Sequence, residues 1–369
     1  MKLVLVGSGS LVRATCLALC VSDGLGVSED HDHDAIEGQP LDVTVLARNA
    51  DATAELCHVA TVRAALAGRA LRFAARTIDP ADATAVAAAL AELDPTGVLV
   101  GASTQSPWEP GDRPSAWTTA MRRAGLGLTL PFQAEVALAV GRAVQLSCPQ
   151  AFVVNACFPD GVNPLLASVG APVLTGVGNV GILAAALQAS LGLPDQSRLR
   201  LLAHHRHLHP PAGPDGEARA WVDDVPVTDV TTRLTVQRQF DRRGMNDVTG
   251  VLAAQLLADL LTGATRDGHL PGVAGRPGGY PVRIHGGSVT LRLPTGVDEE
   301  AAVRANQRWA EDDGVVVRER RVRFAPAVSE VLAEFLPPYA EGFDTDELST
   351  VTATLHHLRE RLRARPAVG

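Results

Sequence analysis

Four histidines lie within six residues of this chain, His204, His205, His207 and His209. An imidazole titrates near neutral pH, so it can take the proton of a hydroxyl while a hydride leaves the carbon. If the segment 199–209 is a strand, the last three share one face and the first lies on the other. We expect His205 first, and His207 second, to be the catalytic acid/base. The alternatives are a metal site, because paired imidazoles can bind one ion, and a polar strand end without a chemical role.

Acidic residues raise two further possibilities. A catalytic histidine needs a group that orients its ring, and Asp160 or Asp247 could do so. Separately, Asp and His alternate from Asp30 to Asp34, within the polar segment Ser22–Pro40. That alternation could bind a metal, but long polar segments are usually solvated surface loops. We interpret it as an insertion loop and predict no resident metal.

A glycine turn follows the first apolar run, with the sequence Gly7-Ser8-Gly9-Ser10-Leu11-Val12. The dinucleotide-binding fingerprint has glycine at the first, third and sixth positions of such a turn. The first glycine permits a tight turn, and the second lets backbone N–H groups approach a pyrophosphate. Val12 replaces the third. Because the turn joins a predicted strand to a predicted helix, we predict that these six residues bind a dinucleotide, with Arg13 as a further phosphate ligand. The alternative is an ordinary turn between strand and helix.

The second strand ends in Arg48-Asn49, where NAD-binding proteins often carry an acidic residue for the ribose hydroxyls. A guanidinium at this place would pair with a 2′-phosphate. We therefore predict that Arg48 and Asn49 contact the cofactor, and that NADP(H) is favoured over NAD(H). The alternative is a surface arginine that covers the adenine.

These residues need a scaffold, and the first 155 residues provide one by alternating apolar runs with helical spacing. Strands are expected over 2–6, 42–47, 71–75, 97–101 and 151–155, and helices over 11–21, 51–67, 79–93 and 132–146. Asp79 is the expected N-cap of the third helix, with Pro80 in its first turn. Such alternation predicts an α/β fold with a doubly wound parallel Rossmann sheet, whose ligand binds beyond the carboxyl ends of its strands.

The order of motifs after the fourth strand is also informative. They are Gly101-Ala102-Ser103-Thr104, Pro110-Gly111-Asp112-Arg113, Val153-Val154-Asn155, the glycine turn in 173–179, the histidine segment 199–209 and the helical spacing of 248–261. In order and spacing, residues 1–317 resemble the lactate/malate dehydrogenase superfamily, which includes the NAD-dependent glycosidases. The resemblance implies that Ala102, Ser103 and Thr104 contact the cofactor, that Arg113 polarises the substrate carbonyl, and that Asn155 contacts nicotinamide or substrate.

The resemblance further implies two domains and a homodimer. The expected division is a dinucleotide-binding domain over 1–178 and an α+β substrate and oligomerisation domain over 179–369, ending in a helical tail. One departure concerns the helix that in the dehydrogenases carries an Asp for the histidine and an Arg for a substrate carboxylate. The matching stretch Val180–Leu187 has neither residue, so lactate and malate are not the expected substrates.

Composition limits the remaining choices. The 369 residues carry a net charge of −8, which disfavours nucleic acid as a partner, and no apolar run is long enough to predict a membrane span. Five irregularly spaced cysteines predict reduced thiols in a cytoplasmic protein. We therefore expect an NAD(P)-dependent oxidoreductase with a small-molecule substrate. The alternatives are a metal-dependent, redox-assisted lyase or hydrolase and a non-catalytic NAD(P)-binding sensor or partner subunit.

Overall fold

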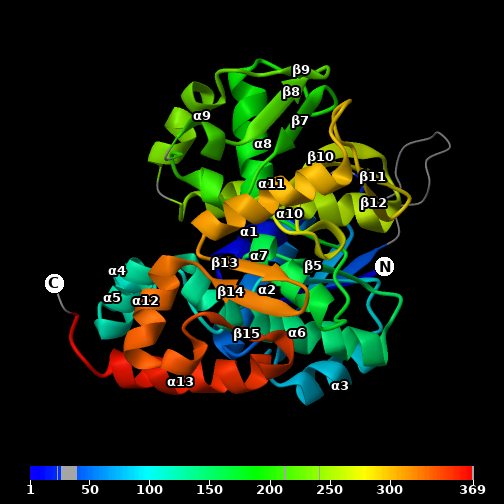
Figure 1. Ribbon diagram of the computed structural model, residues 1–369. Coiled ribbons are helices and arrows are strands. Elements are labelled where there is room, and N and C mark those ends of the chain that lie inside the picture. The colour runs from blue at the N-terminus through cyan, green and yellow to red at the C-terminus, as the bar shows by residue number, and fades with distance from the viewer. Residues whose placement is uncertain (23, 26–39, 212, 241, 368–369) are drawn as a thin grey trace.

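A six-stranded parallel sheet forms the first half of the protein (Figure 1). The computed structural model describes residues 1–22, 24–25, 40–211, 213–240 and 242–367, so the segment Asp30–Asp34 lies outside the described residues. The strand order is β3-β2-β1-β4-β5-β6. The strands are β1 (Lys2–Val6), β2 (Leu41–Ala47), β3 (Leu71–Thr77), β4 (Gly97–Val100), β5 (Phe152–Asn155) and β6 (Thr175–Gly176). The order reverses between β1 and β4, which is where such sheets open a ligand crevice. The predicted doubly wound sheet is confirmed.

Both faces of the sheet are covered, so its central strands β1 and β4 are almost entirely buried and apolar. In β1, Leu3 and Leu5 point into one hydrophobic core and Val4 and Val6 into the other, as the alternation of a strand requires. The helices of this half are α1 (Ser10–Leu19), α2 (Ala50–Leu66), α3 (Ala83–Leu93), α4 (Glu109–Asp112), α5 (Ala116–Ala124), α6 (Leu130–Ser147) and α7 (Pro159–Ser168).

The start of α3 differs from the sequence prediction. Asp82 is the N-cap, and its carboxylate accepts hydrogen bonds from the backbone of Thr84 and Ala85. Asp79, the predicted cap, instead accepts from the backbone N–H of Ala81 in the preceding turn. The prediction was wrong because Asp79 closes this local turn, and the helix begins only after the second aspartate.

The second half contains three small antiparallel sheets and six more α-helices among the described residues. The elements up to the tail are α8 (Asn179–Ser190), β7 (Leu199–Leu202), β8 (Arg219–Val222), β9 (Val225–Pro226), α9 (Val230–Gln239), α10 (Met245–Thr262), β10 (Arg266–Pro271), β11 (Gly279–His285), β12 (Ser288–Leu291) and α11 (Glu299–Asp312). In Figure 1 the β7–β9 sheet, α8 and α9 lie at the top, and α10 and α11 cross the middle. None of the helices in the described residues combines the length and apolarity needed to span a bilayer.

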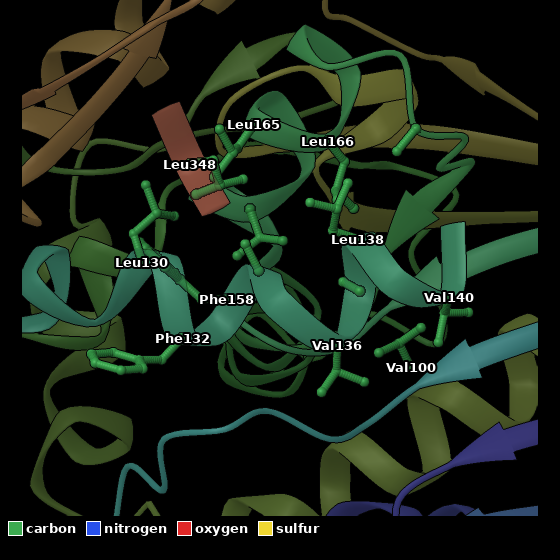
Figure 2. Packing of buried hydrophobic residues seen from close by; sticks show 14 of the residues in the cluster. Val100, Leu130, Phe132, Val136, Leu138, Val140, Phe158, Leu165, Leu166 and Leu348 are labelled. Carbon is green, nitrogen blue, oxygen red and sulfur yellow. The ribbon is translucent and has the colours of Figure 1, made fainter. Parts of the chain in front are cut away.

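The C-terminal segment packs on the first half of the chain. Its elements are β13 (Val315–Arg318), β14 (Arg321–Phe324), α12 (Pro326–Phe335), β15 (Gly342–Asp344) and α13 (Leu348–Arg363). Leu355, Leu358 and Leu362 of α13 are buried in the same core as α5, α6 and α7, each stabilising this docking by about 1.5–3 kcal/mol. Figure 2 shows Leu348 in the same cluster of buried side chains as Leu165 of α7. The division into two domains at residue 178 stays a prediction. The C-terminal helix α13 shares its hydrophobic core with helices of the first half of the chain.

Candidate functional site

A cleft of about 1240 Å³ opens at the carboxyl ends of β1 and β4. The turn after β1, the end of β2, the loop after β4, the histidine segment and the start of α10 all contribute to its wall. Of the residues predicted from the sequence, it is lined by Gly7, Ser8, Gly9, Ser10, Leu11, Arg48, Asn49, Ala102, Ser103 and His205. The cleft therefore lies at the switch point expected for a ligand of this sheet.

The glycine turn has the backbone of a phosphate cradle. Gly7 has a φ of +114°, and a Cβ there would lie 3.0 Å from the Cβ of Ala102, so only glycine fits without strain. Gly9 is the N-cap of α1, whose first turn no side chain caps, and a Cβ at Gly9 would meet no atom within 4 Å. The first N–H groups of α1 thus have open space before them, which is what an anionic group at a helix N-terminus needs.

The missing third glycine of the fingerprint has a structural counterpart. Val12 is fully buried, and its Cγ2 lies 2.5 Å from the place where a Cβ of residue 101 would stand. Residue 101 is glycine, so the close approach of helix to sheet is kept by removing a side chain from the end of β4 instead of from α1. Val12 is therefore a packing residue beneath the turn, outside the lining of the cleft.

The predicted cofactor residues at the end of β2 have different environments. Arg48 is exposed at the cleft and makes no hydrogen bond or ion pair with the described residues. Asn49 is the N-cap of α2, and its side chain accepts the backbone N–H of Ala52 at 3.0 Å. Arg13 is exposed on α1, outside the cleft lining. Arg48 alone of these three offers an uncommitted side chain to a ligand.

The histidine segment is a turn and not the predicted strand. The strand β7 ends at Leu202, and residues 205–208 form a single 3₁₀ turn. The backbone N–H of His204 donates to Nδ1 of His207 at 2.8 Å, and His207 Nε2 lies 3.0 Å from the carbonyl of Gly216. The strand prediction was wrong because these local hydrogen bonds occupy groups that would otherwise pair with a neighbouring strand of a sheet. Both nitrogens of the buried His207 are committed, and burial lowers its pKa to about 4. The role of second acid/base is thus not supported for it.

His205 lies in the cleft wall and is oriented by two carboxylates. Its Nδ1 is 3.0 Å from Oδ1 of Asp313, and its backbone N–H donates to Oδ1 of Asp160 at 2.9 Å. The ring of Phe158 packs edge-on against the imidazole, with 5.6 Å between centroids. Of the two orienting residues predicted, Asp160 holds the backbone only, and Asp247 is exposed on α10. The ring partner is Asp313, which follows α11 and which the sequence analysis missed.

Asp313 is nearly buried and contacts two imidazoles. Nδ1 of His204 lies 2.7 Å from its second oxygen, Oδ2. Burial opposes the charge of Asp313, but His205 and His204 together hold the pKa of its carboxyl well below the usual range. Burial likewise opposes a charge on His204, but Asp313 and Asp160 raise the pKa of that imidazole. Burial raises the pKa of Asp160, against the opposing effect of the two histidines.

Three other predicted residues lie outside the cleft lining. Asn155 is fully buried; its amide donates to Asn163 at 2.9 Å and its oxygen accepts the backbone N–H of Cys157 at 2.9 Å, so it ties β5 to α7. The Thr104 hydroxyl donates to Glu135 at 2.6 Å. Arg113 is exposed at the end of α4. The side chains of Asn155 and Thr104 are thus used for hydrogen bonds within the protein.

Arginines that no motif indicated contribute to the cleft. Arg122, Arg206 and Arg242 line it, and no ion pair joins any of them to a carboxylate of the described residues. Arg242 is half-buried and contacts the ring of the cleft residue His209. The lining also includes the acidic residues Glu311, Asp312 and Asp313, so the cleft wall carries charges of both signs.

The helix α8 contains no charged residue, so it brings no charged group to His205. It packs closely on α10, since a Cβ at Gly181 would lie 2.8 Å from Cδ1 of Leu252. Within the described ranges, no group of three or more His, Cys, Asp or Glu side chains is arranged to hold a metal ion. All five cysteines are free thiols.

Solved structures with the same fold are lactate and malate dehydrogenases. No family model and no curated protein matches the sequence. The malate dehydrogenase of Salinibacter ruber is 11% identical, with 98% of this chain and 99% of that chain covered and a TM-score of 0.53. The lactate dehydrogenase of Eimeria maxima, solved with NADH and oxamate, is 15% identical over 84% of this chain and 91% of that chain, with a TM-score of 0.51. The malate dehydrogenase of Picrophilus torridus is 12% identical over 85% and 96%, with a TM-score of 0.53.

These likenesses confirm the resemblance at the level of the fold. Identities of 11 to 15% leave the chemistry of the cleft to be argued from its own residues.

Proposed function

We propose that this chain, which has the fold of lactate and malate dehydrogenases, is an NAD(P)-dependent oxidoreductase. Its substrate would be a small molecule with a hydroxyl or amine on the reacting carbon. The observation that carries the proposal is that one cleft holds both an uncapped glycine turn and an imidazole oriented by a buried carboxylate. The first feature suits a dinucleotide and the second suits proton transfer, the two requirements of a dehydrogenase.

The residues present fit a nicotinamide dinucleotide. Gly7 permits the tight turn, Gly9 has open space beside it for a pyrophosphate, and the uncapped first turn of α1 supplies N–H donors. Ala102 and Ser103 line the adjoining wall. When bound, the nicotinamide would supply the hydride acceptor or donor. Because Arg48 is uncommitted, we propose a preference for the 2′-phosphorylated form, NADP(H).

His205 would act as the general acid/base. Its Nδ1 faces Asp313, and its Nε2 has no hydrogen-bond partner among the described residues, so a lone pair on Nε2 can accept a proton in the cleft. Asp313 fixes the ring and stabilises the imidazolium that forms as the hydroxyl loses its proton. Acid/base assistance of this kind accelerates reactions by about 10²–10⁴-fold.

The two alternatives differ in what they require. A metal-dependent lyase would use neighbouring histidines as ligands, but both ring nitrogens of His207 are committed within the protein. We therefore do not favour it. A non-catalytic sensor would bind the dinucleotide through the same glycine turn, and it is separated from an enzyme by turnover.

The test is a spectrophotometric screen at the nicotinamide absorption band. Purified protein is supplied with NADP⁺ or NAD⁺ and a panel of hydroxy acids, amino acids, polyols and simple alcohols. The matched control is His205→Asn, whose amide can still donate to Asp313 but offers no base at the position of Nε2. We expect turnover that falls about 10²–10⁴-fold in the variant while cofactor affinity is unchanged. Equal turnover in both proteins would refute the role of His205, and cofactor binding without any turnover would favour the sensor.

A further inference from the structure

The loop after β4 forms one wall of the cleft, and we call its residues 101–113 the cleft loop. Its lining residues beyond Gly101 are Ala102, Ser103, Ser106, Pro107, Trp108 and Pro110. Three others, Thr104, Gln105 and Glu109, lie outside the lining and form hydrogen bonds with the protein behind the loop. The shape of this wall therefore depends on what holds these three residues in place.

A closed ring of hydrogen bonds holds the cleft loop at Thr104. The backbone N–H of Thr104 donates to the carbonyl of Phe132 at 3.2 Å, and its hydroxyl donates to Glu135 at 2.6 Å. Its carbonyl accepts a hydrogen bond from Nη1 of Arg359 at 2.6 Å. Nη2 of Arg359 donates to Nδ1 of His356 at 2.8 Å, and Nε2 of His356 lies 2.8 Å from Glu135. All three polar groups of Thr104 are thus bonded on the side away from the cleft.

Arg363, one turn further along α13, holds the cleft loop at Glu109. Its guanidinium makes two hydrogen bonds with the Glu109 carboxylate, with 2.7 Å between Nε and Oε1. The same carboxylate accepts from the amide of the fully buried Gln105 at 2.8 Å, and the Gln105 oxygen accepts from the indole N–H of Trp117 at 3.0 Å. Because the Glu109 side chain is only 7% exposed, its charge requires the guanidinium partner.

The packing of α13 places both arginines. Leu355, Leu358 and Leu362 bury one face of this helix in the core that contains α5, α6 and α7. Arg359 and Arg363 are four residues apart, so they lie on one face of the helix and reach the loop together. The Arg359 side chain is 9% exposed, and such burial strengthens its hydrogen bonds. No residue of α13 lines the cleft itself.

The contacts on the other side of the cleft loop are more exposed. Arg243 contacts the carboxylate of Asp112, and its guanidinium lies 5.1 Å from the ring centroid of Trp108. The side chains of Arg243 and Asp112 are 49% and 52% exposed, so water and salt screen this pair. The buried bonds to α13 are therefore the stronger anchors of the loop.

We propose that Arg359 and Arg363 are positioning residues, which hold the cleft loop as a fixed wall against which the dinucleotide binds. A ligand that meets an ordered wall loses no affinity to the ordering of that wall. When an anchor is removed, only a fraction of the molecules has the wall in place, and the observed affinity falls by that fraction. The effect on affinity rests on the proposed function; the fixed position of the loop does not.

The first test needs no nucleotide and follows hydrogen–deuterium exchange of peptides that cover residues 101–113. Arg359→Met keeps a long side chain over Phe132, 4.7 Å from the guanidinium in this structure, but removes the donors to Thr104 and His356. The matched control is Arg361→Met, an exposed position of α13 that makes no hydrogen bond or ion pair with the described residues. We expect exchange in the loop to become about tenfold faster in Arg359→Met, with β1 and β4 unchanged, and to stay slow in the control.

Two results of this experiment would overturn the inference. One is rapid exchange of the cleft loop in the unaltered protein, which would show that the wall is not fixed. The other is the same loop exchange in the control and in a natively folded Arg359→Met. If Arg359→Met does not fold, the exchange of the loop in the unaltered protein decides.

The second test titrates NADPH into the same proteins while nicotinamide fluorescence is followed. We expect the Kd to rise about tenfold in Arg359→Met and in Arg363→Met and to stay unchanged in Arg361→Met. Arg359→Lys, which keeps a donor for the Thr104 carbonyl, should recover most of the affinity. A purely structural role would lower the thermal midpoint but leave the Kd of the folded variants unchanged, and that result would overturn the inference. Absence of binding to the unaltered protein would sink the proposed function, and loop exchange would then decide on the fixed wall.

Discussion

The packing between α1 and the end of β4 allows a stringent test of how this chain departs from the glycine fingerprint. A Cβ at residue 101 would lie 2.5 Å from Val12 Cγ2 but 4.0 Å from Val12 Cβ, which is ordinary van der Waals contact. Gly101→Ala alone therefore overpacks the site and should cost about 1–3 kcal/mol of unfolding free energy. Val12→Ala alone removes two buried methyl groups and should cost about 1.5–3 kcal/mol.

The double variant is the informative one. Val12→Ala removes the atom with which the new methyl group collides, and Gly101→Ala partly fills the cavity that the valine leaves. We expect the two costs to be non-additive, with a coupling of about 1–2 kcal/mol in favour of the double variant. Urea unfolding followed by circular dichroism measures the four proteins of this cycle, with Gly111→Ala as the control, because a Cβ at Gly111 meets no atom within 4 Å. Additive costs would show that the exchange of valine for glycine is not what maintains the helix–sheet distance.

Three further predictions concern single side chains. Arg48→Ala should weaken NADPH binding about 10- to 100-fold and leave NADH binding nearly unchanged, because only the 2′-phosphate pairs with the guanidinium; titration calorimetry with both nucleotides measures this. Arg363→Gln should lower the unfolding free energy by roughly 1–3 kcal/mol, since it leaves the buried Glu109 carboxylate without the guanidinium that is 2.7 Å from it, and Glu109→Gln in the same chain should recover part of that loss in thermal unfolding. Burial lowers the pKa of His269 to about 3, so the unfolded chain binds this proton first and stability falls as the pH drops from about 6.5 toward 3. His269→Gln, whose oxygen can accept the Leu201 N–H, should reduce the slope of stability against pH by up to about 1.4 kcal/mol per unit in urea unfolding at pH 7 and 5.

The sheet was predictable because its signal is local. Each buried strand is a short apolar run with a turn after it, and the glycine turn lies where the first strand meets its helix. The histidine turn was not predictable, because what bends residues 204–208 are hydrogen bonds to Asp160 and Gly216, whose positions no spacing reveals. The same holds for Asp313, which reaches His205 from more than one hundred residues away.

Two residues that the sequence places at the ligand also have hydrogen-bonding roles in the scaffold, which the sequence does not reveal. Asn155 stands where the family resemblance places a ligand contact, but its amide is used to join β5 to α7. Asn49 likewise caps a helix. A motif shows where a side chain is in the chain, and only the fold shows which hydrogen bonds it has already made. The homodimer, the small-molecule partner and the division at residue 178 stay predictions.

The most direct test of the central claim is whether the cleft binds a nicotinamide dinucleotide. NADPH and NADH are titrated into the protein while nicotinamide fluorescence is followed, in the unaltered chain and in Gly9→Val. Because a Cβ at Gly9 meets no atom within 4 Å, the valine should leave the fold intact and fill the space meant for the pyrophosphate. The account predicts saturable binding at one site per chain that weakens at least tenfold in Gly9→Val, with an unchanged thermal midpoint. Absence of binding to either nucleotide, or equal affinity in both proteins, would contradict it.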